Sequence, residues 1–258
     1  MKKIIFILFL GILSNVFSDN NEYIRESKYI GGIYEPGSFE IINNIIVEIN
    51  GERYQYVIEE IDGLTYIFYG EGFYGKRDNK KLLLFSKDFL LIYNNETNYN
   101  FYGTTHTGRR TEGYVPIKFT GVSSSLTEND INYEINNLAS FNQRMPWVEG
   151  VEGNGLGEYL EFSEDHGYTN IIISIGYVDY SKPYLYKENS RPKTIKIISE
   201  NYELIYHLDD TPNPQRINLP ERTDKFKIEI IEVYQGTKYE DTCINFVFSD
   251  LFYGDGPF

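Results

Sequence analysis

The chain has 258 residues, of which 41% are apolar and 24% are charged, so it is long enough to fold around one or two hydrophobic cores. Lys and Arg number 24 against 38 Asp and Glu, which gives a formal net charge of -14. This acidity argues against a nucleic-acid partner and against docking on anionic lipid, because both contacts need positive charge. The chain has 24 tyrosines, and tyrosine both favours strands and can face a polar ligand.

The N-terminus has the three parts of a secretory signal peptide. Lys2 and Lys3 form a short basic segment, Ile4–Leu13 is almost purely apolar, and Val16–Ser18 offers a cleavage point. The apolar run is short for a transmembrane span, which favours cleavage after about Ser18 over an uncleaved anchor. Because no second long apolar run follows, the sequence predicts a secreted or periplasmic protein without a transmembrane segment.

From about Tyr29 to Gly103 the sequence predicts a β-meander or a small barrel. Short apolar or alternating runs are separated by turn signals. Asn50–Gly51 and Asp62–Gly63 are strong two-residue hairpin signals, because these residue types tolerate the left-handed backbone of such turns. Sequential strands joined by tight turns usually lie side by side and can curl into a barrel. We expect an N-terminal domain over residues 19–113, ending in the polar hinge Thr104–Glu112.

Residues 114–258 are also rich in predicted strands, which favours an antiparallel β-sandwich over βαβ units. The predicted strands cover the stretches 159–162, 171–178, 194–199, 202–208, 216–219, 226–233 and 244–248. A helical pattern is present only near Ile131–Ser140, and it is short. The fold class is therefore expected to be all-β, with an N-terminal meander or small barrel followed by a sandwich.

The sequence gives little support for catalysis or for a cofactor. With one cysteine, Cys243, and three histidines, it has neither a disulfide framework nor a cysteine-based zinc site. Gly153, Gly155 and Gly157 precede a predicted strand and stand beside three carboxylates that would repel phosphate, so they predict a tight turn rather than a dinucleotide site. Two alternatives stay open among the many carboxylates: a glycosidase pair, and one structural Ca²⁺ ion held by loop oxygens.

Several motifs of the second half occur in the order found in a known family. They are Ser123–Glu128, Asn137–Leu138, Trp147–Gly150, Gly153–Tyr159, Ile175–Tyr177, Asn189–Lys193, Leu208–Asp209 and Val233–Ile244. From about Val115 to Asp250 the chain resembles the discoidin-like (F5/8 type C) domain that accompanies bacterial NAD glycohydrolase toxins. The resemblance implies a galactose-binding-like jelly roll that binds glycans or serves toxin translocation, with NAD hydrolysis in a separate domain. The loop Ala139–Pro146 departs from the family pattern, so the ligand can differ from that of relatives.

The motifs supply a candidate ligand-binding set: Trp147, Glu149, Glu158, Tyr177, Asn189, Arg191, Tyr239 and Asp241. Aromatic faces cover the apolar side of a sugar ring, while amide, guanidinium and carboxylate groups bond to its hydroxyls. Structural alternatives stand beside this interpretation. Trp147 can pack in the core, the two glutamates can cap backbone amides or pair with Arg191 as a clamp between loops, and Tyr239 with Asp241 can close a turn.

The sequence favours a secreted or periplasmic, non-catalytic protein whose partner is a glycan or a cell-envelope polysaccharide. The alternatives are a structural or adhesive surface protein with a protein partner, a toxin-associated module, and an enzyme with its active site in the N-terminal half. Such an enzyme would need a concave pocket there, with convergent polar groups and perturbed carboxylates.

Overall fold

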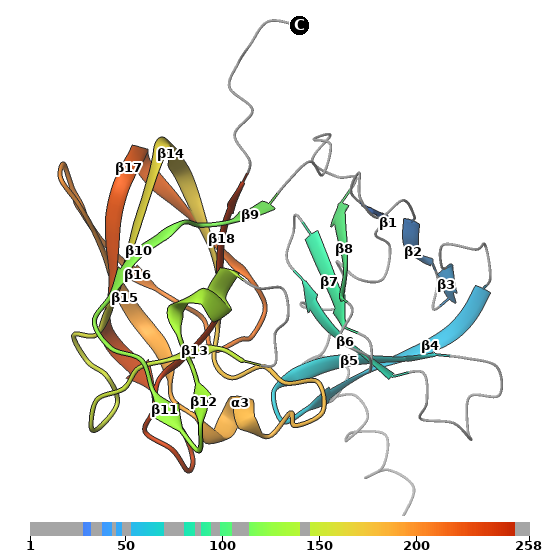
Figure 1. Ribbon diagram of the computed structural model, residues 1–258. Helices are drawn as coiled ribbons and strands as arrows, with labels where there is room; N and C mark the ends of the chain where they lie inside the picture. The colour runs from blue at the N-terminus through green and yellow to red at the C-terminus, as the bar shows by residue number, and fades with distance from the viewer. Residues whose placement is uncertain are drawn as a thin grey trace, which may run out of the picture.

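The computed structural model describes residues 28–31, 38–42, 45–47, 53–69, 80–85, 89–93, 99–104, 114–139 and 145–250. The protein is all-β, as the sequence predicts, with an N-terminal barrel followed by a β-sandwich (Figure 1). The predicted leader, the Asn50–Gly51 turn, and residues 105–113 and 140–144 lie outside the described residues. Within that described part of the chain, no helix has the length and the hydrophobicity needed to cross a membrane.

The barrel strands follow one another in chain order and pair antiparallel, and the pairing of the first strand with the last closes the barrel. They are β1 (Lys28–Gly31), β2 (Ser38–Ile42), β3 (Ile45–Val47), β4 (Arg53–Ile61), β5 (Leu64–Tyr69), β6 (Lys80–Phe85), β7 (Phe89–Tyr93) and β8 (Tyr99–Thr104). Asp62 and Gly63 join β4 to β5 with φ angles of 54° and 88°. Both residues have the left-handed backbone that the predicted two-residue hairpin requires, so this turn is confirmed.

The sandwich contains a sheet in the strand order β13-β18-β14-β17-β15-β16, with β10 beside β14 and β9 beside β18. The strands of this sheet are β9 (Tyr114–Pro116), β10 (Phe119–Val122), β13 (Trp147–Val148), β14 (Tyr159–Ile175), β15 (Arg191–Ser199), β16 (Glu203–His207), β17 (Gln215–Tyr234) and β18 (Cys243–Asp250). A separate two-stranded sheet consists of β11 (Thr127–Glu128) and β12 (Ile131–Asn132). Two pairs of predicted strands merge into the long β14 and β17. Register shifts between Ser163 and Asn170 carry β14 through its polar middle without ending it.

The structure contains a helix that the sequence did not predict. The pattern near Ile131–Ser140 forms a 3-10 helix, η3 (Ile135–Ala139), preceded by the strand β12. A separate α-helix, α3 (Leu185–Glu188), was not predicted. Four residues are too few to show a helical period, so its sequence contains no signal of this kind.

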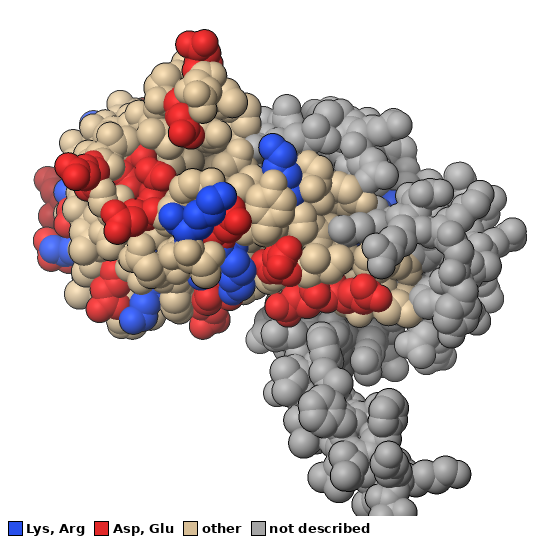
Figure 2. Space-filling view, turned by 90° about the horizontal axis from the view of Figure 1, so that it is seen from below, with Lys and Arg blue, Asp and Glu red and all other residues tan. Residues whose placement is uncertain are grey.

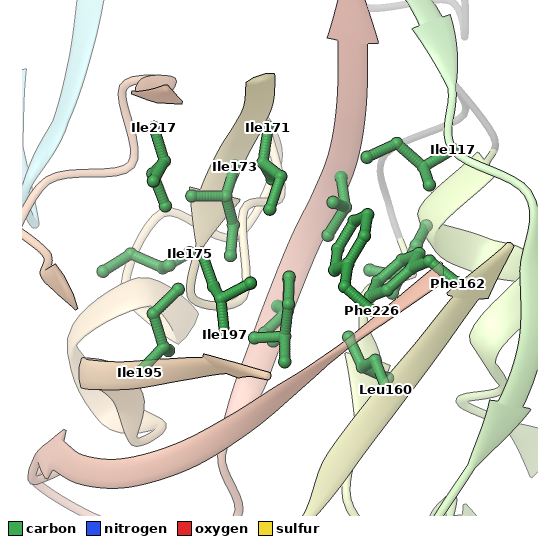
Figure 3. Packing of buried hydrophobic residues seen from close by; sticks show 14 of the residues in the cluster. Ile117, Leu160, Phe162, Ile171, Ile173, Ile175, Ile195, Ile197, Ile217 and Phe226 are labelled. Atoms are coloured by element: carbon green, nitrogen blue, oxygen red, sulfur yellow. The ribbon is translucent and has the colours of Figure 1, made fainter. Parts of the chain in front are cut away.

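Inward-facing side chains of the sandwich form its core (Figure 3). Ile171, Ile173 and Ile175 line one face of β14, and Ile195 and Ile197 of β15 belong to the same cluster. Farther along, the rings of Phe162 and Phe226 stack with their centroids 4.9 Å apart. This burial of apolar side chains is the main stabilising contribution to the sandwich.

A second hydrophobic cluster joins the barrel to the sandwich. It consists of Leu64, Tyr66, Leu82 and Leu84 from the barrel and Ile172, Val178, Tyr186, Phe246 and Phe248 from the sandwich. The register shifts between β14 and β18 at Ser174 and Ile175, so Ile244 faces the sandwich core while Phe246 faces the barrel. Because β14 is covered on both faces, its apolar residues run together instead of alternating.

Candidate functional site at the loop end of the sandwich

The structure brings most of the predicted residues together at one end of the sandwich, beside β11, β12 and α3 in Figure 1. We call this region the loop end and define it as residues 123–133, 149–158, 184–190 and 235–242. Backbone contacts hold these loops to one another. Ser190 pairs with Thr242 in a β-bridge, and the Ser190 hydroxyl accepts a hydrogen bond from the Gly236 N–H at 3.0 Å. Most of the candidate residues therefore lie close together in the structure, although they are far apart in the sequence.

Glu149 ties the glycine-rich loop to the start of β18. Its side chain is fully buried, and its two carboxylate oxygens accept hydrogen bonds from the backbone N–H groups of Val151 at 2.9 Å and Thr242 at 3.2 Å. Burial raises the pKa of Glu149, although these two N–H groups act in the opposite direction. Gly155 packs on the carboxylate with a φ of 65°, and a Cβ there would lie only 2.5 Å from the Glu149 Cγ. The predicted tight glycine turn is confirmed, and Glu149 caps backbone amides.

Ser123 and Ser124 connect Trp147 to Glu158. Trp147 is fully buried, and its indole N–H donates to the Ser124 carbonyl at 3.0 Å. Both serine hydroxyls donate to one carboxylate oxygen of Glu158, that of Ser123 at 2.6 Å. The Ser124 hydroxyl also accepts from the Gly150 N–H at 2.8 Å. Trp147 thus has the core packing of its structural alternative, whereas Glu158 bonds to serine hydroxyls and not to the backbone amides or the Arg191 named in its alternative. Ligand contact by either residue stays a prediction.

Arg191 forms the predicted clamp between loops, but its partner is Asp210 rather than either predicted glutamate. The guanidinium is buried and donates to both Asp210 oxygens, from Nε at 2.8 Å and from Nη2 at 3.0 Å. Its Nη1 donates to the carbonyls of Tyr186 at 3.1 Å and Asn189 at 2.9 Å. The guanidinium also lies 4.9 Å from the centroid of the Tyr186 ring. The clamp therefore holds α3 against the loop that follows β16.

The charge of Asp210 should make this clamp sensitive to acid. Burial by itself would raise the pKa of Asp210, but hydrogen bonds and charge from Arg191, with help from Lys187 and Tyr186, lower it below the ordinary value of an aspartate. A carboxyl group whose pKa is lowered by folding stabilises the folded state above its unfolded pKa, and that contribution is lost as the pH falls through the folded pKa. We expect Asp210→Asn to reduce the free energy of unfolding by about 1.5–3 kcal/mol at neutral pH.

Urea titrations from pH 7 to pH 3 measure this effect. The difference between wild type and Asp210→Asn should stay constant down to about pH 5 and shrink below about pH 4. Asp209→Asn is the matched control, because Asp209 precedes Asp210 in the chain and its hydrogen bonds to Gln215 use backbone atoms, which the substitution leaves in place. A difference that does not change with pH would contradict a role for the Asp210 charge.

Tyr239 is the only exposed residue of the candidate set, with 39% of its surface accessible. Its backbone N–H donates to the Glu188 carbonyl at 2.8 Å, and its carbonyl accepts from the Ser190 hydroxyl at 3.4 Å. The Lys238 ammonium lies 4.7 Å from the centroid of its ring. An exposed aromatic ring is thereby carried on a loop whose backbone is hydrogen-bonded to α3.

The remaining three candidates are less accessible. Asn189 is buried, and its side-chain amide donates to the Leu185 carbonyl at 2.9 Å. Tyr177 is half-buried, meets Tyr133 edge to face at 6.1 Å, and has a pKa that burial raises. Asp241 is half-buried, and its carbonyl accepts from the Ser190 N–H at 3.1 Å.

Sequence reasoning missed the exposed apolar side chains of the same loops. Ile131, Val151 and Leu156 are exposed at the loop end. The hairpin that carries Ile131 is joined to the loop of Val151 by a hydrogen bond from the Leu126 N–H to the Val148 carbonyl at 2.9 Å. Val151 and Leu156 lie in a loop, where strand periodicity does not apply, and Ile131 lies in the two-residue strand β12, which is too short to show it.

A groove of about 430 Å³ lies away from this set, on β10, β14, β15 and β17. It is lined by Thr120, Glu161, Phe162, Ser163, Ile198, Ser199, Glu200, Lys225, Phe226 and Lys227, none of which belongs to the candidate set. No three His, Cys, Asp or Glu side chains are grouped as a metal site in the described ranges. The groove is thus the second place to test for a ligand.

Residues 111–249 match a known family, described as the NAD glycohydrolase translocation F5/8 type C domain. The match covers more than half of the chain and spans the sandwich from β9 to β18. The chain belongs to this family. The predicted discoidin-like resemblance is therefore confirmed, and the matched domain is of a binding or translocation type.

The chain is also similar in part to several solved structures. The arabinofuranosyltransferase AftD from Mycobacteria is 13% identical over 56% of this chain and 11% of that chain, with a TM-score of 0.41. The family 32 carbohydrate-binding module from C. perfringens NanJ, in complex with galactose, is 13% identical over 50% of this chain and 90% of that chain, with a TM-score of 0.36. The matched region is thus about a tenth of the length of AftD. Among curated proteins, no relative of the sequence was found.

Proposed function

We propose that the protein is a secreted or periplasmic, non-catalytic binding protein that recognises carbohydrate at the loop end of its F5/8 type C domain. The observation that carries the proposal is the exposed ring of Tyr239, fixed beside Lys238 where the loop 235–242 meets α3 and Ser190. An aromatic face of this kind covers the apolar side of a sugar ring, and neighbouring polar groups bond to the hydroxyls. Along the chain, Tyr239 is flanked by the ammonium of Lys238 and the carboxylate of Glu240, and the carboxylate of Asp241 follows.

The order of the loops supports the proposal. Gly236 has no room for a side chain, since a Cβ there would lie 2.3 Å from the Tyr239 carbonyl oxygen. The Gly236 N–H bonds to Ser190, and the Tyr239 N–H bonds to the Glu188 carbonyl. A loop held in this way loses little conformational freedom when a ligand binds, so more of the contact energy appears as affinity.

The surface charge at this end favours a neutral ligand. Figure 2, which views the molecule from below, shows basic and acidic side chains interspersed over the sandwich rather than gathered by sign. Without a single-sign patch there is no strong field to attract a highly charged partner. A neutral sugar needs no such field, because stacking and hydrogen bonds supply its recognition.

Replacing Tyr239 by alanine tests the site. After a glycan array has identified a ligand, titration calorimetry should show affinity reduced at least tenfold in Tyr239→Ala, about 1.4 kcal/mol or more, because an aromatic contact surface is lost. Lys225→Ala, in the groove, is the matched control and should bind as wild type does. Loss of binding in Lys225→Ala with retention in Tyr239→Ala would move the site to the groove, and the absence of any glycan ligand would contradict the proposal.

A role in toxin translocation is the second candidate function, favoured by the description of the matched family. It predicts that the protein binds an NAD glycohydrolase polypeptide rather than a free sugar. Size-exclusion chromatography of the two proteins, alone and mixed, distinguishes these functions. Co-elution without any glycan ligand would favour translocation, and separate elution with a glycan ligand would favour carbohydrate binding.

A further inference from the structure

The strand β16 forms an open edge of the sandwich sheet. Among the described strands it pairs with β15 only, and Figure 1 shows it on the side of the sandwich away from the barrel. Glu203, Ile205 and His207 are exposed along it, and Ile205, at 60%, is the most exposed large apolar side chain in the described part of the chain. An edge of this kind is a template for another strand, and β16 carries neither the proline nor the lysine that commonly protects one.

The hydrogen-bond pattern shows which backbone groups face the open edge. At the two ends of the β15–β16 pair, the Ser199 N–H donates to the Tyr202 carbonyl at 2.9 Å and the Leu208 N–H donates to the Lys193 carbonyl at 2.8 Å. Along an antiparallel pair of strands, residue pairs that exchange backbone hydrogen bonds alternate with residue pairs that do not. In the observed register, the even-numbered residues of β16 therefore bond to β15. The backbone groups of Glu203, Ile205 and His207 point away from it.

We propose that two copies of the protein associate through β16, paired antiparallel about a two-fold axis at Ile205. Each residue whose backbone N–H and C=O point away from β15 then lies opposite such a residue of the second copy. These backbone groups can form the hydrogen bonds of an ordinary antiparallel ladder. Ile205 lies opposite Ile205 of the second copy, which removes an exposed apolar side chain from water on both copies. Glu203 lies opposite His207 of the second copy, so no like charges meet.

Other registers fit less well. A shift by two residues in one direction places Ile205 against the carboxylate of Glu203, and a shift in the other direction places it against the imidazole of His207. Either shift also leaves one outward-facing residue on each copy without an outward-facing partner. The register centred on Ile205 is self-complementary, and because its symmetry is two-fold it closes as a dimer instead of growing into a fibre.

The strength of the association follows from its size and from charge. A contact built on one five-residue strand is small, so the dimer should be weak and should depend on protein concentration. Each copy carries a formal charge of -14, and two such copies repel each other in solution. Added salt screens this repulsion, so the dimer should strengthen as ionic strength rises.

Cysteine cross-linking tests the register directly. Ile205→Cys, treated with a short bifunctional thiol reagent, should give a covalent dimer on a denaturing gel. Val151→Cys, at the exposed loop end, should not. The natural Cys243 is buried, so it contributes no background reaction. Sedimentation velocity of the wild type should show a monomer–dimer equilibrium that Ile205→Lys abolishes, because two ammonium groups would then face each other.

Two outcomes would overturn the proposal. One is a wild type that stays monomeric at every concentration and salt tested, with Ile205→Cys cross-linking no faster than Val151→Cys. The other is a dimer that Ile205→Lys leaves intact, which would place the interface elsewhere. Ile205→Cys and Ile205→Lys both replace an exposed side chain, so we expect both variants to fold, and circular dichroism checks this.

Discussion

Phe246→Ala should reduce the free energy of unfolding by about 3–5 kcal/mol, the cost of removing a fully buried aromatic ring from a packed core. Phe246 lies in the cluster between barrel and sandwich and stacks on Phe248 with the ring centroids 4.5 Å apart. The barrel residues Leu64 and Tyr66 belong to the same cluster. The substitution should therefore both destabilise the protein and weaken the attachment of the barrel.

Urea unfolding measures the first effect and limited proteolysis the second. In Phe246→Ala, cleavage within the barrel should accelerate more than the loss of global stability explains. Ile197→Ala is the matched control, because Ile197 is fully buried in the sandwich core on the side away from the barrel. Ile197→Ala should also reduce the free energy of unfolding by about 2–5 kcal/mol, but it should leave the barrel attached. The interface does not hold the barrel in place if Phe246→Ala lowers the free energy of unfolding by less than about 1 kcal/mol. The same conclusion follows if the barrel is cleaved at the same rate in the two variants.

Trp147→Ala should also reduce the free energy of unfolding by about 3–5 kcal/mol, and it should loosen the loop end although Trp147 itself lies in β13. The indole is fully buried in the sandwich core, and its N–H satisfies the Ser124 carbonyl. Ser124 in turn bonds to Glu158 and to the Gly150 N–H, so the loss of the ring should loosen three loop segments together.

Trp147→Phe separates packing from hydrogen bonding. The smaller ring keeps much of the contact but leaves the Ser124 carbonyl without its donor, so we expect a loss of about 1–3 kcal/mol. Thermal and urea unfolding rank the two variants. If Trp147 serves structure alone, glycan affinity measured on the folded fraction should be unchanged in Trp147→Phe. A large loss of affinity in a variant with wild-type stability would instead make the indole a ligand contact.

Local sequence signals predicted most of the strands and the class of the fold. The Asp62–Gly63 turn is one example, because the preference for a left-handed backbone lies in the two residues themselves. The order of motifs from Ser123 to Ile244 identified the family, since each motif specifies a turn or a loop contact of its own domain. The same motifs indicated the loop end as the candidate site, but not which side chains are exposed there.

Only the tertiary structure decided how distant segments meet. The partner of Arg191 is Asp210 because α3 and the loop after β16 are folded together, and nothing in the spacing of those residues distinguishes Asp210 from the two glutamates. Phe246 faces the barrel because a register shift turns it away from the core side of β18. A periodic pattern reports that a side chain is buried, but not what buries it. The sequence by itself therefore determined strands, turns and family, whereas the clamp, the attachment of the barrel and the open edge of β16 depend on long-range contacts that local preference does not encode.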